Sequence, residues 1–415
     1  MKRLAPFLVC IVTLVLAEAT VRAFFATRVG PRVLFYGTSR FRNFQIPVAQ
    51  QSAQSHGNQV GDYQPYEAYG SRSYSKYFPN ESKVTESPDH RETYPVRINN
   101  HGFRGKDFAI EKAPGTVRVV TLGASSTFGY HDRDEETYPY YLEQILNGQA
   151  PDGTRFEVIN FGIPHAISDN MVALFLAEGV PLDPDVVTFY EGANDSAVLE
   201  RGDPGLRGTV WMSLRRRLLG VELLNYVLGL GASADGYGWS DELAERRSQA
   251  FLRNIRLLSE ECRKRGIRLI VTTQQMQPVM VGSQAKGTTY QDDVRLVKEK
   301  LARGEVSHIH FDSPFLNPVG HLLSQFDPAR VLLIHARMMS DLAAWAATSD
   351  VGFVDLIAAL DHDRDLLVNW VHLKAEGNRK IAEALAPEVL RQVAIRRQRP
   401  RAAKAAVAPG VRAAS

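Results

Sequence analysis

Cysteine is almost absent from this sequence, with two residues in 415. Cys10 lies in an apolar run near the N-terminus, and Cys262 lies in a stretch with helical spacing of apolar residues. Two isolated cysteines exclude a disulfide framework and a cysteine-based zinc site. A fold must therefore be held by its core, and a composition of 44% hydrophobic and 23% charged residues is typical of a globular protein.

A strong excess of charge is also lacking, since the formal net charge is only +3. The sequence contains no basic and aromatic module of the kind that binds nucleic acid, so we expect no nucleic-acid partner. His308 and His310 could lie on one face of a strand as two metal ligands, but a surface or half-buried pair is the commoner situation for two such histidines. We therefore predict neither a metal site nor a cofactor.

Only one long apolar run is present, and it lies at the N-terminus. Lys2 and Arg3 precede the apolar residues 4–17, and Ala17-Glu18-Ala19 at their end resembles a cleavage site. A basic start followed by such a run is typical of a signal peptide. An uncleaved anchor reaching to about Phe25 is the alternative, because a spanning helix needs about 20 residues. We predict that residues 1–27 are a signal anchor or signal peptide, which places the rest of the chain outside the cytoplasm, in the periplasm or at the cell surface.

A polar, tyrosine-rich segment follows over residues 28–95. It has neither helical nor strand periodicity, and we interpret it as an extended juxtamembrane arm. Its tyrosines could line a glycan-binding surface or pack the segment onto the following domain; they are Tyr63, Tyr66, Tyr69, Tyr74 and Tyr77.

Regular alternation of strands and helices begins after residue 96 and continues to residue 395. Continuous apolar strands that alternate with helices predict a parallel sheet with helices on both faces. The fold class is therefore three-layer α/β/α with about five parallel strands. We expect strands at 116–122, 156–162, 185–192, 267–273 and 351–356, and helices at 137–146, 168–179, 240–266 and 375–394.

Two further segments fall outside this alternation. Residues 210–231 are apolar and amphipathic but interrupted by arginines, and we interpret them as a cap helix over a site. Residues 396–415 are basic, alanine-rich and contain prolines, which predicts a disordered tail.

One serine stands where the first core strand is expected to end. In the stretch VVTLGASSTFGY (119–130), Ser125 follows the strand directly and has small neighbours. Sites in parallel α/β sheets form at the carboxyl ends of strands, and a nucleophilic serine needs a base and fixed donors for an oxyanion. A phosphate-binding turn or a helix N-cap would also fit this stretch. It is not a G-x-S-x-G elbow, since Thr127 stands two residues after the serine.

Polar and glycine residues at the next strand ends complete a possible site. Gly162 ends the second strand, Gly192 and Asn194 follow the third, and His372 precedes the last helix. Each could have a purely structural role, as a turn glycine, a capping residue or a packed loop histidine. Their common position at strand exits and helix entries predicts that they meet at one edge of the sheet.

The whole set resembles the SGNH (GDSL-like) hydrolase family, of the membrane-tethered bacterial type. The resemblance covers residues 96–395 and includes the lead-in INNHGFRG; its blocks are Gly123–Gly129, Asn160–Gly162, Gly192–Asp195 and His372–Asn378. It implies a flavodoxin-like fold in which Ser125 is the nucleophile and His372 the general base and acid. The Ser125 and Gly162 amides and the Asn194 side chain would hold the oxyanion, with Gly192 beside them.

One position departs from that family. Three residues before the histidine the family has an aspartate that orients the imidazole, and here the residue is Asn369. The Asn369 oxygen could accept the Nδ1 proton of His372 but could not stabilise an imidazolium as a carboxylate does. Three solutions remain open. A nearby carboxylate replaces the aspartate, with Asp365 as the first candidate before Asp361 and Asp363; a Ser-His dyad with a backbone carbonyl suffices; or the protein is catalytically weak.

The function implied by the resemblance is that of a serine esterase or deacylase. It would remove an O-acyl group, with acetyl as the first expectation, from an envelope glycan or a small ester through a serine acyl-enzyme. Its partners would be an acylated carbohydrate or small ester and, through residues 1–27, a membrane. Two alternatives are an O-acetyltransferase that uses the same Ser-His site and a catalytically silent glycan-binding protein.

Overall fold

The computed structural model describes eight stretches of the chain: residues 5–29, 64–67, 73–89, 91–151, 153–197, 241–277, 287–303 and 328–398. The predicted cap helix at 210–231, His308 and His310, and residues 399–415 of the predicted tail lie outside these stretches.

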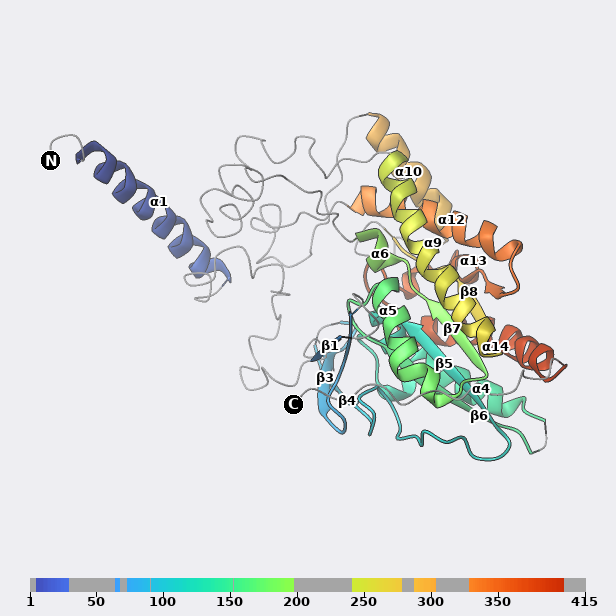
Figure 1. The fold of residues 1–415 in the computed structure, drawn as a ribbon. Coiled ribbons are helices and arrows are strands. Elements are labelled where there is room, and N and C mark those ends of the chain that lie inside the picture. The colour runs from blue at the N-terminus through green and yellow to red at the C-terminus, as the bar shows by residue number, and fades with distance from the viewer. Residues whose placement is uncertain are drawn as a thin grey trace.

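A parallel sheet of five strands forms the centre of the molecule (Figure 1), in the order β6-β5-β7-β8-β9. The register of the three strands at one side brings Gly123 beside both Gly162 and Tyr190, so the carboxyl ends of β5, β6 and β7 meet at one edge. The predicted parallel α/β class is therefore confirmed. The strand bounds are β5 Thr116–Gly123, β6 Arg155–Gly162, β7 Val186–Tyr190, β8 Arg268–Thr272 and β9 Gly352–Val354.

Side chains alternate along each strand, so both faces of the sheet carry apolar side chains, and helices cover both faces. Val120 and Leu122 of β5 belong to the core that the sheet shares with α5, α9 and α12. Val117 and Val119 point the opposite way, into the core formed with α4 and α14. Figure 1 shows α5 and α9 lying across one face. These helices are α4 Tyr138–Gly148, α5 Ser168–Leu174, α9 Asp241–Lys264, α12 Pro328–Ala347 and α14 Ala375–Gln398.

Most predicted helices are observed close to their expected bounds, with one change. The helix expected at 168–179 is α-helical only to Leu174 and continues as a π-turn over Phe175–Gly179. Pro181 lies two residues further on and has no N–H to continue the helical hydrogen bonds. The remaining short elements are α3 Ser125–Phe128, η2 Asp134–Glu136, η3 Phe175–Gly179, η4 Val180–Leu182, α6 Ala193–Ala197, α10 Tyr290–Ala302, α13 Leu356–Leu360 and η6 Arg364–Leu366.

The segment before the sheet is more ordered than the sequence predicts. β1 (Gln64–Glu67) pairs with β2 (Ser73–Lys76), and β3 (Ser82–Glu86) pairs with β4 (Thr93–Arg97), both antiparallel. The expectation of an extended arm up to residue 95 is therefore wrong for these residues, because β4 crosses that boundary.

Two of the five tyrosines named above are described in full, and both belong to the core. Tyr74 and Tyr77 are buried in it, and the Tyr74 hydroxyl donates to Glu178 at 2.8 Å. The packing alternative is thus confirmed for these two side chains. Tyr66 lies in β1, whereas Tyr63 and Tyr69 lie outside the described residues.

The N-terminal segment forms the helix α1, Ala5–Val29, in which Arg22 and Glu18 form an ion pair of 2.7 Å. In the part of the chain that the structure describes, no helix combines the length and the apolar character needed to cross a membrane.

Candidate active site

Ser125 begins a single turn of helix directly beyond the end of β5. Gly123 is the last residue of the strand, and a Cβ there would lie 1.8 Å from the Thr127 Oγ1. Gly129 ends the turn at φ 87°, a conformation that suits glycine, and its N–H donates to the Ser125 carbonyl. The glycines around Ser125 therefore permit a tight strand-to-helix turn that presents this serine at the sheet edge.

Gly162 lets the end of β6 contact the backbone of α3. A Cβ at this position would lie 2.1 Å from the Phe128 nitrogen. Its own N–H donates to the Asn160 Oδ1 at 2.8 Å. The oxyanion role predicted for Gly162 would require this amide to exchange the Asn160 oxygen for the oxyanion. Close packing is what requires glycine here.

Asn194 lies on α6 and is held by one side-chain and one backbone hydrogen bond. Its Nδ2 donates to the Ala166 carbonyl at 2.9 Å, and its backbone N–H donates to the Glu191 Oε1 at 2.6 Å. A side-chain amide carries two N–H bonds. One remains for an oxyanion, so Asn194 keeps the chemistry that the sequence predicts for it.

Gly192 lies where close packing requires glycine. A Cβ at Gly192 would lie 2.4 Å from the Met339 Cε and 3.2 Å from the His335 Nε2. Its N–H helps to lower the pKa of Glu191, as does that of Asn194, but burial dominates and raises that pKa to about 8. Gly192 therefore lets α12 approach the loop that carries Asn194.

His372 reaches Ser125 from 247 residues further along the chain. Its Nε2 lies 2.7 Å from the Ser125 Oγ. The loop before α14 that carries it is closed by a 2.7 Å bond from the Val368 N–H to the His372 carbonyl. Ser126, next to the nucleophile, links α3 to this loop, since its hydroxyl donates to the Val371 carbonyl at 3.1 Å. The structure thus brings together the nucleophile and the base that the sequence predicts.

The Asn369 side chain contacts the other ring nitrogen of His372, Nδ1, through its amide nitrogen. Its Nδ2 lies 2.8 Å from the His372 Nδ1. Its Oδ1 accepts the backbone N–H groups of Val371 and His372 at 3.1 and 3.0 Å. The expectation that the Asn369 oxygen would accept the Nδ1 proton is therefore wrong, because that oxygen is held by two backbone donors.

Asp365 does not take the place of the missing aspartate. It lies in η6, where its backbone carbonyl accepts the Lys374 ammonium at 2.7 Å. Asn369 occupies the position at Nδ1 where a substituting carboxylate would have to lie. The loop itself is held by the fully buried Arg364, whose guanidinium donates to the Thr289 carbonyl at 2.9 Å and pairs with Asp293.

Three further side chains surround His372, and sequence reasoning missed them. The Tyr130 ring stacks on the His372 ring at 5.2 Å between centroids, and the His131 ring meets it edge-on at 5.3 Å. His165, in the loop after β6, has a positive φ of 64°. Their only signal in the sequence is their position in loops that follow the two predicted strand ends.

These surroundings make the imidazolium form of His372 unfavourable. Its pKa lies well below the usual range because burial penalises the charged ring and because His131 and His165 would add positive charge nearby. His131 is held by β3, since its Nδ1 lies 3.1 Å from the Glu86 carbonyl and its N–H donates to the Thr85 hydroxyl. A hydrogen bond to a carbonyl makes that Nδ1 a donor.

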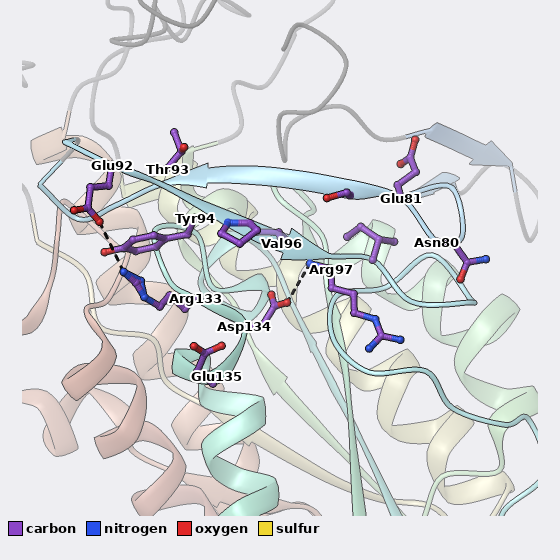
Figure 2. A pocket seen from close by; sticks show the side chains of 13 residues that line it. Asn80, Glu81, Glu92, Thr93, Tyr94, Val96, Arg97, Arg133, Asp134 and Glu135 are labelled. Carbon is purple, nitrogen blue, oxygen red and sulfur yellow. Dashed lines mark hydrogen bonds and ion pairs between the residues drawn. The ribbon is translucent and has the colours of Figure 1, made fainter. Parts of the chain in front are cut away.

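A cleft of about 610 Å³ lies between β4 and the segment 133–135 (Figure 2). The Tyr94 ring lies on the Arg133 guanidinium at 3.8 Å, and Glu92 reaches the same guanidinium at 3.8 Å. Asp134 accepts the Arg97 N–H at 3.1 Å from the opposite side. Arg133, in the wall of the cleft, lies two residues beyond His131 in the chain.

Comparison with known proteins agrees with this architecture. Residues 121–380 match the GDSL-like Lipase/Acylhydrolase family. No curated protein matches the chain.

Solved structures with this fold are distant in sequence. A lipolytic protein of the G-D-S-L family from Desulfitobacterium hafniense DCB-2 is 14% identical, with 66% of this chain and 99% of that chain covered and a TM-score of 0.37. A catalytic mutant of Axe2, an acetylxylan esterase from Geobacillus stearothermophilus, is also 14% identical, with 67% and 94% covered and a TM-score of 0.35. The family match spans more than half of the 415 residues. The chain therefore belongs to the GDSL-like lipase/acylhydrolase family and is a carboxylic ester hydrolase.

Proposed function

We propose that this chain removes an O-acyl group, with acetyl as the first expectation, through an acyl-enzyme on Ser125. The observation that carries the proposal is the 2.7 Å contact between the Ser125 Oγ and the His372 Nε2. A serine hydroxyl becomes a useful nucleophile when an adjacent base takes its proton.

The reaction would proceed in two steps. Ser125 Oγ attacks the ester carbonyl while its proton passes to the His372 Nε2, and the same proton then goes to the departing alcohol oxygen as the C–O bond breaks. Water repeats the sequence against the acyl-enzyme, returning Ser125 and releasing the acid. The second N–H of the Asn194 amide and the first-turn amide of Ser125 would hold the oxyanion, because an α-helix leaves its first amides without intrahelical acceptors.

The substrate class that we propose is an acylated carbohydrate. The cleft between β4 and 133–135 supports this because its charges are mostly paired within the protein: Glu92 with Arg133, Asp134 with Arg104 at 2.8 Å, and Arg97 with Asp107 at 2.6 Å. A half-buried aromatic ring surrounded by neutralised polar groups suits a neutral, hydroxyl-rich ligand better than an ionic one. The acyl group would then lie at Ser125 while the sugar chain extends toward Tyr94.

We also propose that the catalytic domain acts outside the cytoplasm and is tethered to a membrane through residues 1–27. The basic start and apolar run of the sequence are what support this proposal. Fractionation of cells with an antibody against α14 would test it; recovery of the full-length chain in the cytoplasmic fraction would contradict it.

Active-site labelling tests the proposed chemistry. The full-length chain is treated with a fluorophosphonate probe, and the adduct is mapped by mass spectrometry. We expect labelling of Ser125 in the wild type, none in Ser125→Ala, and a large loss of rate in His372→Ala because the base is gone. A folded wild-type protein that carries no label on Ser125 would contradict the proposal.

A further inference from the structure

The orientation of the Asn369 amide is decided by its neighbours. Its Oδ1 receives two backbone N–H groups, those of Val371 at 3.1 Å and His372 at 3.0 Å. Turning the amide over would point an NH₂ group at both donors and leave them without an acceptor. A group that faces two N–H donors must be the oxygen, so the nitrogen faces His372.

This orientation determines which nitrogen of the neutral imidazole carries the proton. The Asn369 NH₂ can only donate, so the His372 Nδ1, at 2.8 Å from it, must present its lone pair. The proton of the neutral ring then lies on Nε2, which is 2.7 Å from the Ser125 Oγ. In this tautomer the histidine donates to the serine, whereas a general base must accept from it.

We propose that Asn369 is a positioning residue that holds His372 in the Nε2–H tautomer and so restrains the esterase site in its resting state. The inference rests on the proposed function of Ser125 and explains how that function is limited. Proton transfer from Ser125 requires the lone pair on Nε2, so the ring proton must first move to Nδ1. On Nδ1 the proton would face the NH₂ group of Asn369. Only a rotation of that amide would relieve this, and the rotation would break the hydrogen bonds from both backbone N–H groups to Oδ1.

The other groups around the ring do not relieve this restraint. Tyr130 stacks on the ring, His131 meets it edge-on, and His165 lies near enough to repel an imidazolium. None of the three carries a negative charge that would favour a proton on Nδ1. An aspartate at 369 would do so, because one carboxylate oxygen could keep the two backbone donors while the other accepted the Nδ1–H.

The test measures the tautomer and the rate separately. Full-length protein with ¹⁵N-labelled histidine reports by NMR which nitrogen of His372 is protonated at neutral pH, with the signal assigned from a His372→Gln sample. We expect the proton on Nε2 in the wild type and on Nδ1 in Asn369→Asp. Wild-type protein with the proton on Nδ1 would overturn the proposal without the need for any variant.

The rate measurement uses p-nitrophenyl acetate as the substrate and compares the wild type with Asn369→Asp. We expect kcat to rise at least tenfold with KM little changed; the reverse change in a serine protease lowers kcat by about 10⁴. The control is Gln144→Glu, the same amide-to-carboxylate change on the exposed face of α4, which should leave kcat unaltered.

The pH profile and the label separate the possible failures. In Asn369→Asp the acidic limb of kcat should move to higher pH, because a carboxylate at Nδ1 raises the pKa of His372. An unchanged rate and limb in a folded variant that still labels on Ser125 would refute the restraint alone. Absence of label on Ser125 in both proteins would instead refute the proposed function, while the NMR result would still decide the tautomer.

Discussion

At the scale of single residues, the site depends on glycines whose role is to let backbones approach. Gly123, Gly162 and Gly192 each lie where a Cβ would come within 2.4 Å of another atom. The sequence motifs name these glycines as part of a chemical site. The structure adds that close packing requires glycine at two of them, Gly162 and Gly192, whose amides donate to Asn160 and Glu191.

Replacing Gly162 by alanine tests this assignment. The added methyl would lie 2.1 Å from the Phe128 nitrogen, so α3 and Ser125 would have to move. We expect a loss of about 1–3 kcal/mol in the free energy of unfolding, measured in urea, as for an overpacked core. Fluorophosphonate labelling of Ser125 should slow as well.

Gly148→Ala is the matched control for that change. It lies in α4 and has no atom within 4 Å of the added Cβ, so the variant should be as stable as the wild type or slightly more stable. Equal stability of the Gly162 and Gly148 variants would show that the contact with α3 is not tight.

At the scale of elements, the β3–β4 hairpin links the catalytic edge to the cleft. β3 holds His131 through Thr85 and Glu86, and β4 supplies Tyr94 to the cleft wall. Arg133 lies two residues from His131, which limits the separation of their Cα atoms to about 7 Å. We propose that a sugar chain bound at Ser125 extends past His131 toward Tyr94.

Tyr94→Ala should separate long substrates from short ones. With acetylated xylotetraose we expect kcat/KM to fall about tenfold, mainly through KM, because stacking on an aromatic ring contributes roughly 1 kcal/mol or more to binding. Activity on p-nitrophenyl acetate should not change, since that ester does not reach the cleft.

The control for this experiment is Tyr140→Ala, an exposed tyrosine on α4 that does not line the cleft. It should leave both activities as in the wild type. If Tyr94→Ala lowers the rate on both esters equally, or on neither, the cleft does not hold the carbohydrate.

At the scale of the whole molecule, the sheet holds buried ionisable groups that make stability depend on pH. Glu191 is 1% exposed at the end of β7, and burial raises its pKa to about 8 from 4.5. Between these two values the folded state binds more protons than the unfolded state. Stability therefore falls as pH rises through this window.

Glu191→Gln should remove much of that dependence. For the wild type we expect Tm to fall by on the order of 5 °C between pH 5 and pH 8, and a clearly smaller fall in the variant. Differential scanning calorimetry across this range measures it, with the exposed Glu383→Gln on α14 as the control. A wild-type Tm that rises over the same range would contradict the buried, protonated carboxyl.

The sequence by itself determined the architecture and named the pair that we propose as the reacting residues. Continuous apolar strands alternating with amphipathic helices allow little else than a covered parallel sheet, and Ser125 and His372 stand at positions where such a sheet gathers its loops. The sequence did not predict the strands β1 to β4, because short polar strands carry no clear periodicity and become stable only when paired and packed.

Only the tertiary structure decided the state of the site. The sequence shows that Asn369 replaces an aspartate, but it could not show which end of the amide faces His372. That choice follows from two backbone N–H groups that converge on Oδ1 when the 366–374 loop closes. The roles of Gly162 and Gly192 likewise depend on acceptors and neighbours that approach them only in the folded chain.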